Sequence, residues 1–174
     1  LEPFGKVPVG LKSCYPFGQS VLPNKPHKVK APASERALQS IDYQFGKGAS
    51  KPFQKSEIES SKRTGRLRRL WTKDKALLGT FRPSDGFFLP TLDGAKLLGK
   101  AIKKVKINDA DVAKLVSEGN AVFAKFASPS AGILPSEEVA VIHKGKLLGV
   151  GRAYLNSEEM EQMKRGVAVE VRSS

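Results

Sequence analysis

From about residue 34 onward, the apolar segments of this chain are short, and they end at glycine, proline or small polar residues. Such segments predict short strands and short helices, which together indicate an α+β fold. Runs without a charged residue reach 12 residues at most, too few to cross a bilayer, and no basic-then-apolar signal peptide opens the sequence. We therefore expect a cytoplasmic protein that does not bind membranes.

The first folded part begins with a helix that has signals at both ends. Ser34 is the expected N-cap, Leu38, Ile41 and Phe45 recur at helical spacing, and Gly46 ends the helix. Turn residues then separate short strands and one further helix. These expected elements are a hairpin over 66–72 and 76–82, a turn over 83–86, a strand over 87–90 and a helix capped by Thr91.

The sequence from about residue 103 onward predicts mostly strands. Asp109 is expected to open a helix that Gly119 ends, and Asn156 with Glu159 has capping-box spacing at the start of another. The sequence Lys-Gly-Lys at 144–146 predicts a hairpin turn. The expected strands cover 103–107, 120–127, 138–143, 147–155 and 167–172, and this combination with two small helices indicates a small β-barrel-like domain.

Residues 1–33 are expected to behave differently, because they contain six of the eleven prolines. Proline fixes φ and has no N–H to donate, so this segment should be extended and irregular. It also carries apolar residues such as Leu11, Tyr15 and Phe17. We therefore expect it to lie packed along the folded body.

Net charge gives the first indication of a partner. The chain has 30 basic and 17 acidic residues, a net charge of +13, and the excess is concentrated in residues 1–80, with 16 basic and 6 acidic side chains. A half-chain this basic attracts polyanions, above all nucleic acid, through counterion release. A merely solvated surface is the alternative. An acidic membrane surface is a weaker one, because no amphipathic helix with a wide apolar face accompanies the charge.

The chain has few residues for catalysis or metal binding. Its one cysteine, Cys14, excludes an internal disulfide and a cysteine-rich zinc site, and two histidines, His27 and His143, make a triad or a multi-histidine site hard to assemble. We therefore expect a protein that is not an enzyme and holds no metal or cofactor. With no general base indicated nearby, Cys14 is expected to be a buried or half-buried thiol.

Several blocks of the sequence resemble a known family. A resemblance to the PUA domain rests on GNAVFAKF from Gly119, EEVAVIHKGKLLGVGRAYLNSEEM from Glu137 and RGVAVEVR from Arg165. The upstream blocks SIDYQFGKGA, SKRTGRLRRLW, GTFRPSDGFF and TLDGAKLL resemble the companion domain that precedes PUA in archaeal tRNA-guanine transglycosylase and archaeosine synthase, and YPFGQSVLP resembles the segment that leads into it. The resemblance implies a companion domain, a PUA domain and RNA binding.

The same resemblance does not imply the reaction. The transglycosylase carries out its chemistry in a separate barrel domain, with an aspartate nucleophile and a Cys/His zinc site, and neither can be placed in this sequence. What remains resembles the tRNA-gripping C-terminal part, either encoded alone or split from a catalytic partner. The chain departs from the family at Ser136-Glu137, where members often have Gly-Asp before the EV strand. The conformation of that turn therefore does not follow from the resemblance.

The densest cluster of positive charge, which we call the basic ridge, lies within residues 62–75. An imperfect period of two in RLRRLWT places Leu67 and Arg69 opposite Arg66, Arg68 and Leu70. Arginine binds phosphate through two parallel hydrogen bonds, so RNA contact is favoured over protection of a strand edge. Trp71 can stack on a base, but we expect it in the core. The basic ridge consists of Lys62, Arg63, Arg66, Arg68, Arg69, Lys73 and Lys75, and the first five are the candidate RNA-binding residues.

A second candidate surface lies in the PUA-like part, where PUA domains usually bind RNA. On a single strand over 120–127, Phe123 and Lys125 share a face, which suits a stacked base and its phosphate, although a core Phe123 with an extended lysine is an equal alternative. Gly119 either allows close approach of RNA or ends a helix. The candidates are Gly119, Asn120, Phe123 and Lys125, together with Lys164, Arg165 and Arg172 near the last strand. Lys96, Lys100, Lys103 and Lys104 match a solvated helix face.

These observations predict an extended segment over 1–33, a companion α+β domain over 34–103 and a PUA domain over 104–174. The expected function is binding of structured RNA, most of all the acceptor stem and 3′ end of tRNA, in support of tRNA modification. A catalytic transglycosylase-like protein is the expected partner. A ribosome-biogenesis factor is the first alternative, and an enzyme with an unrecognised site is the second.

Overall fold

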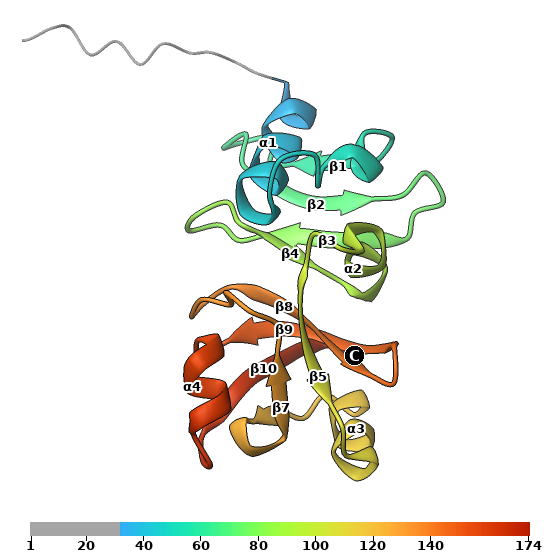
Figure 1. Cartoon of the computed structure of the whole chain (residues 1–174). Coiled ribbons are helices and arrows are strands. Elements are labelled where there is room, and N and C mark those ends of the chain that lie inside the picture. Colours follow the sequence, from blue (N-terminus) through green and yellow to red (C-terminus); the bar gives the residue numbers. More distant parts are fainter. Residues whose placement is uncertain (1–31) are drawn as a thin grey trace, which may run out of the picture. The chain divides into compact units, whose positions relative to one another are not determined.

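A computed structural model describes residues 32–174 (Figure 1). The expectations for residues 1–31 and for Cys14 and His27 therefore lie outside the described residues. The first described part contains α1 (Ala33–Phe45), the 3-10 turn η1 (Lys51–Phe53), β1 (Glu57–Ser60), β2 (Leu67–Trp71), β3 (Leu77–Phe81), β4 (Phe88–Pro90) and α2 (Leu92–Leu98). Its four strands pair in the order β1-β2-β3-β4, and all three pairs are antiparallel.

Helix α1 covers one side of this sheet and is fixed at both ends. Ala37 and Ile41 are fully buried on its inner face. After Gly46 ends the helix, the Asp42 carboxylate accepts hydrogen bonds from the Gly48 and Ser50 amides, which ties the following turn to the helix. The predicted N-cap is wrong: the helix begins one residue before Ser34. Extended backbone at Pro32 sets its start, and no side chain caps it.

The predicted hairpin is confirmed as β2 and β3, but the alternation along β2 is not. Glu59 pairs with Arg69 and the next residue, Ser60, pairs with Leu67, so Arg68 is an extra residue in a β-bulge. The bulge turns Leu67 toward the same core that buries Leu70. It leaves Arg68 and Arg69 both exposed, whereas a strict period of two placed them on opposite faces.

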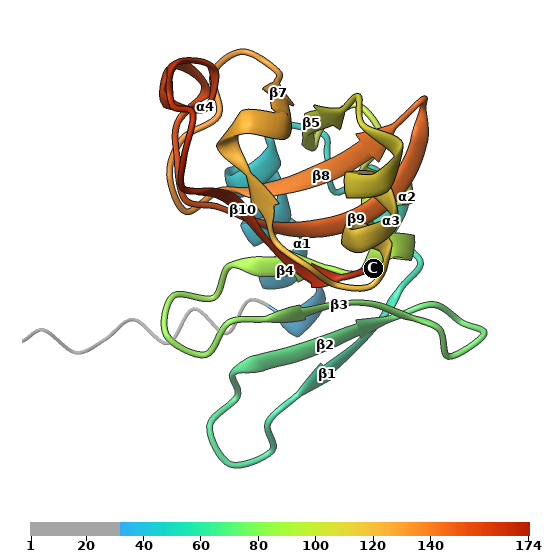
Figure 2. The ribbon, with the colours of Figure 1, turned by 90° about the horizontal axis from the view of Figure 1, so that it is seen from below.

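The second part is a β-rich unit. It contains β5 (Lys103–Ile107), α3 (Ala110–Ser117), β6 (Val122–Phe123), the 3-10 turn η2 (Ala124–Phe126), β7 (Ala127–Pro129), β8 (Glu138–His143), β9 (Lys146–Ala153), α4 (Ser157–Gln162) and β10 (Val167–Ser173). The strands pair in the order β6-β10-β9-β8-β5-β7, with β5 parallel to β8 (Figure 2). Only η2 separates β6 from β7, the two edge strands, so the sheet must curve until its edges meet. This confirms the barrel-like expectation.

Local signals set most of the ends of these elements. Asp109 accepts hydrogen bonds from two amides of α3, and Asn156 and Glu159 form the predicted capping box of α4. The hairpin of β8 and β9 turns at Lys144 and Gly145, which both have positive φ, as a tight two-residue turn requires. At Ser136, whose turn the resemblance left open, φ is +73°, a left-handed conformation that glycine adopts without strain.

The two sheets meet through α2. This helix contacts both β3 and β9, and Ala140 and Val150 of the second sheet belong to the same buried core as Leu78 and Leu98 of the first part. A second core, around Val105, Val139 and Val169, fills the barrel. The proposed boundary between residues 103 and 104 falls inside β5, which follows α2 directly.

Candidate nucleic-acid interface

The basic ridge lies on β2 and on the loops at its two ends. Lys62, Arg63 and Arg66 are exposed in the loop between β1 and β2, Arg68 and Arg69 are exposed on β2, and Lys73 and Lys75 are exposed in the turn to β3. The bulge at Arg68 explains why consecutive arginines both reach solvent. The fold thus brings four of the five predicted residues, the arginines, to the wall of one cavity, and Lys62 lies beside Arg63 in the loop.

These arginines surround an open cavity of about 540 Å³. One of them is anchored, because the Arg66 guanidinium donates to the Pro83 carbonyl at 3.4 Å. An anchored guanidinium keeps free N–H groups in a defined direction, which suits phosphate oxygens. Within the described part of the chain, no acidic residue lines the cavity: its walls are Ser61, Arg63, Thr64, Arg66, Leu67, Arg68, Arg69, Thr80, Phe81 and Pro83.

Trp71 lies outside the core, contrary to expectation. It is half-buried on β2, and the Arg69 guanidinium lies 6.0 Å from its ring centre. Arg69 also faces Glu59 of the neighbouring strand at 3.7 Å, with 54% of its side chain exposed. The buried residue of this strand is Leu70, which turns toward α1 and leaves the flanking Trp71 on the outer face.

On the PUA-like part, Phe123 is exposed and Lys125 is not beside it. The predicted strand over 120–127 is wrong, because η2 interrupts it after Phe123. In this turn the Lys125 ammonium lies 5.5 Å from the ring of Phe126 instead. Phe123 has 51% of its surface exposed, which excludes the alternative that it is a core residue.

The other predicted residues lie along β10. Phe123 pairs with Val167, and the Ala124 amide donates to the Gly166 carbonyl, so Lys164 and Arg165 lie near η2. Gly119 lies toward the opposite end of β10, near Ser174, where a φ of +92° lets it end α3. Asn120 caps the same helix, because its side-chain amide donates to the Leu115 carbonyl. All of these residues are exposed, but Arg172 differs from the others because its guanidinium is paired.

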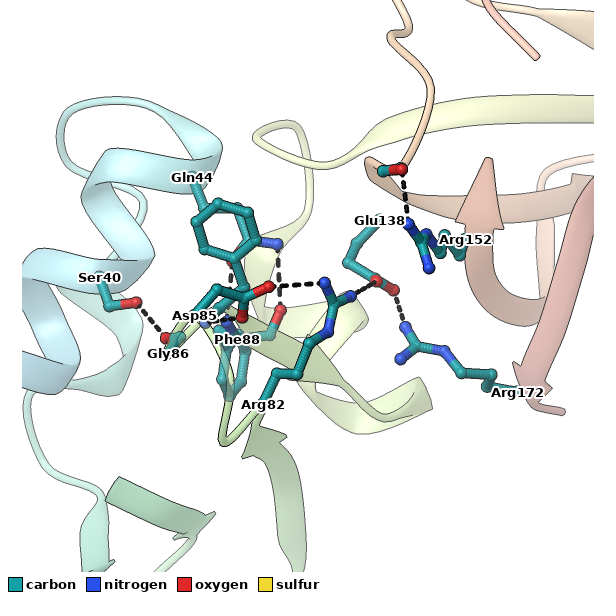
Figure 3. A network of polar contacts seen from close by, with 11 residues as sticks. Ser40, Gln44, Arg82, Asp85, Gly86, Phe88, Glu138, Arg152 and Arg172 are labelled. Carbon is teal, nitrogen blue, oxygen red and sulfur yellow. Dashed lines mark hydrogen bonds and ion pairs between the residues drawn. The ribbon is translucent and has the colours of Figure 1, made fainter. Parts of the chain in front are cut away.

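Arg172 faces the companion domain (Figure 3). Its guanidinium pairs with Glu138, whose side chain is only 1% exposed and lies 3.5 Å from the Arg82 guanidinium. Arg82 also pairs with Asp85 at 2.8 Å. Burial, and then the like charge of Arg82, lower the pKa of Arg172. The prediction of Arg172 as an RNA contact rested on its position near the last strand, and no local pattern indicated that β8 would bring a carboxylate beside it.

Among the described residues, His, Cys, Asp and Glu side chains form no group of three or more that is suited to a metal ion. In the same part of the chain, no helix has the length and apolar character needed to span a membrane.

Comparison with protein families matches both parts of the chain. Residues 35–104 match the patch-forming domain C2 of tRNA-guanine transglycosylase, and residues 103–174 match the PUA domain. The tRNA-guanine(15) transglycosylase of Thermococcus kodakarensis is 35% identical over 97% of this chain, and that of Korarchaeum cryptofilum is 36% identical over 91%. This chain covers 30% and 28% of these two relatives, so it spans less than a third of their length.

Solved structures share the fold at low sequence identity. A hypothetical protein of Pyrococcus horikoshii aligns with 81% of this chain and 89% of its own, with a TM-score of 0.63 and 17% identity. A PUA domain of Aeropyrum pernix aligns with 80% of this chain and 79% of its own, with a TM-score of 0.58 and 17% identity. The arrangement of both parts therefore recurs in other chains.

Proposed function

Because this chain is a PUA-domain protein that resembles the C-terminal part of archaeal tRNA-guanine transglycosylases, we propose that it binds structured RNA, and tRNA in particular. The observation that carries the proposal is the cavity lined by four arginines of the basic ridge. Phosphate is the anion that matches several closely spaced guanidinium groups, and a folded RNA presents many phosphates at once. The net charge of +13 supports the same partner.

The proposed mechanism divides binding between the two domains. The basic ridge neutralises backbone phosphates, which positions the RNA without reading its sequence. The PUA face recognises the acceptor stem and the unpaired 3′ end, where the exposed Phe123 offers a ring for one base and Lys164 and Arg165 offer charge for its phosphate. Gly119 and Asn120 follow the end of α3, and both are exposed. Because glycine has no side chain, RNA can approach the backbone closely there.

We further propose that the chain binds tRNA without modifying it and supports a catalytic protein partner. The support is that the chain spans about 30% of the Thermococcus relative, which leaves most of that enzyme's length unmatched.

The test uses the purified chain with a tRNA transcript and a 3′-trimmed version of it. We expect binding to the intact tRNA, weaker binding after removal of the unpaired 3′ end, and no exchange of radiolabelled guanine into tRNA with or without added zinc. An affinity for tRNA no greater than for an uncharged polymer would exclude the binding proposal. Guanine exchange by the pure chain would exclude the non-catalytic one.

A further inference from the structure

An exposed tyrosine on the companion domain lies against a half-buried phenylalanine, outside the basic ridge. Tyr43 of α1 has 83% of its surface exposed, the highest value among the large apolar and aromatic side chains of the described residues. Its ring centre lies 6.5 Å from that of Phe87, and the two ring planes are inclined by 32°. A flat ring that is supported on one side and open on the other is a ready platform for stacking.

The pair is held in place by the turn between β3 and β4. Ser40 donates to the Gly86 carbonyl at 2.7 Å, and the Gln44 side chain donates to the Phe88 carbonyl and accepts from the Phe88 amide (Figure 3). These three hydrogen bonds come from residues on either side of Tyr43 in α1. They fix the turn that carries Phe87 against the helix, so the two rings are arranged before any ligand binds.

Arginines continue from this pair to the basic ridge. The Arg82 guanidinium lies 6.0 Å from the ring centre of Phe87. Arg82 also lines a second open cavity, of about 360 Å³, together with Arg36 and Arg66. Because Arg66, Leu67 and Pro83 line both this cavity and the one of the basic ridge, the two are adjacent.

The second cavity keeps a net positive charge, although one acidic residue lines it. Asp85 is the acidic residue in the second cavity, and its carboxylate is taken up by Arg82 at 2.8 Å and by the Phe87 amide at 3.0 Å. Burial by itself would raise the pKa of Asp85, but these two hydrogen bonds outweigh it and lower the pKa, so the carboxylate stays paired with Arg82. Arg36 is anchored to the Gly65 carbonyl at 2.9 Å and, like Arg66, keeps N–H groups free for an anion.

We propose that Tyr43 and Phe87, with Arg36 and Arg66, form a site for a run of unpaired RNA nucleotides on the companion domain. One base stacks on Tyr43, and the following phosphates lie against Arg36 and Arg66 on the way to the basic ridge. A duplex keeps its bases stacked inside, so only unpaired nucleotides can use the aromatic pair. The inference rests on the proposed RNA binding and adds to it a second, stacking site away from the PUA face.

The test compares Tyr43→Ala with Tyr43→Phe, which keeps the ring, and with Tyr154→Ala, a matched control that removes a 48% exposed tyrosine from the PUA part. The probes are a single-stranded oligouridine and a blunt RNA duplex with the same number of phosphates. Stacking of one base predicts that Tyr43→Ala weakens oligouridine binding by about fivefold or more. Duplex binding should stay unchanged, and the other two variants should bind as the parent does.

Photocrosslinking locates the contact independently of affinity. An oligouridine that contains 4-thiouridine should crosslink to peptides with Tyr43 or Phe87 in the parent. The crosslink at residue 43 should be lost in Tyr43→Ala, in which Phe87 is unchanged. Because Tyr43 is so exposed, the thermal midpoint of Tyr43→Ala should equal that of the parent. Parent-like oligouridine affinity of Tyr43→Ala, with crosslinks confined to the PUA part, overturns this site alone. A parent that binds neither probe nor tRNA overturns the proposed function as well.

Discussion

Two groups of arginines in this chain differ in whether a carboxylate faces them. Within the described part of the chain, Arg63, Arg66 and Arg68 of the basic ridge form no ion pair. At the junction between the two sheets, Arg82 and Arg172 share the buried Glu138. The comparison teaches that the same residue type joins two domains where a buried carboxylate faces it, and stays available for an external partner where none does. The position of one buried glutamate, which composition does not reveal, decides between the two uses.

The largest effect is expected from breaking the paired group. Glu138→Gln keeps the shape of the side chain but removes the carboxylate that Arg82 and Arg172 share, so that Arg172 loses its ion pair and Arg82 keeps only Asp85. Loss of one partner of a buried pair costs about 3–5 kcal/mol, and we expect the low end, about 3 kcal/mol, because both arginines are partly exposed. Chemical denaturation of the parent and the variant measures the difference.

An exposed ion pair supplies the matched control for this change. Glu59 faces Arg69 at 3.7 Å with 40% of its side chain exposed, so Glu59→Gln should cost less than about 1 kcal/mol. Equal losses of stability in Glu138→Gln and Glu59→Gln would show that burial of Glu138 does not matter. RNA affinity of folded Glu138→Gln should be close to that of the parent.

A smaller effect, on RNA binding more than on stability, is expected at the basic ridge. The triple change of Arg66, Arg68 and Arg69 to Ala should weaken binding by about 2 kcal/mol, since each exposed charge pair contributes up to about 1 kcal/mol. The loss should be the same for many RNAs, because phosphate contacts do not read sequence. Anisotropy titrations with tRNA, a duplex and a single strand measure it. A loss confined to one of the three RNAs would mean that these arginines read more than phosphates.

The smallest effect is expected on the PUA face. Phe123→Ala should weaken binding by about 1 kcal/mol, the low end of the range for one stacked base, because half of the ring is already packed against the protein. Only RNAs with an unpaired 3′ end should be affected. The measurement pairs a tailed with a blunt RNA and includes thermal unfolding of the variant. A folded variant that binds both RNAs as the parent does would remove Phe123 from the interface.

The sequence predicted the elements that local chemistry determines. Caps at Thr91, Asp109 and Asn156 and the hairpin turn at Lys144 are each set by residues within a few positions of one another, and all were found as expected. The resemblance of the quoted blocks to companion and PUA domains was confirmed by both family matches.

The failures have tertiary causes. The bulge at Arg68 arises from pairing with β1, and the break after Phe123 arises because the barrel must close at η2. Trp71 was expected inside because aromatic residues are usually buried, but Leu70 fills the core position. The ion pair of Arg172 was not foreseen, because its partner, Glu138, is 34 residues away in sequence. Neither hydrophobic periodicity nor a helix-capping motif indicates contacts between residues so far apart in the sequence.

The most direct test of the account is the salt dependence of tRNA binding by the parent and by the Arg66, Arg68 and Arg69 triple variant. If the basic ridge neutralises about four to six phosphates, the log–log slope of affinity against salt should be roughly −3 to −5 for the parent. Loss of three phosphate contacts should make the slope shallower by about 2.7 in the triple variant. A parent whose affinity does not change with salt, or a triple variant with the parent's slope, would contradict the claim that arginines of the basic ridge bind the RNA backbone.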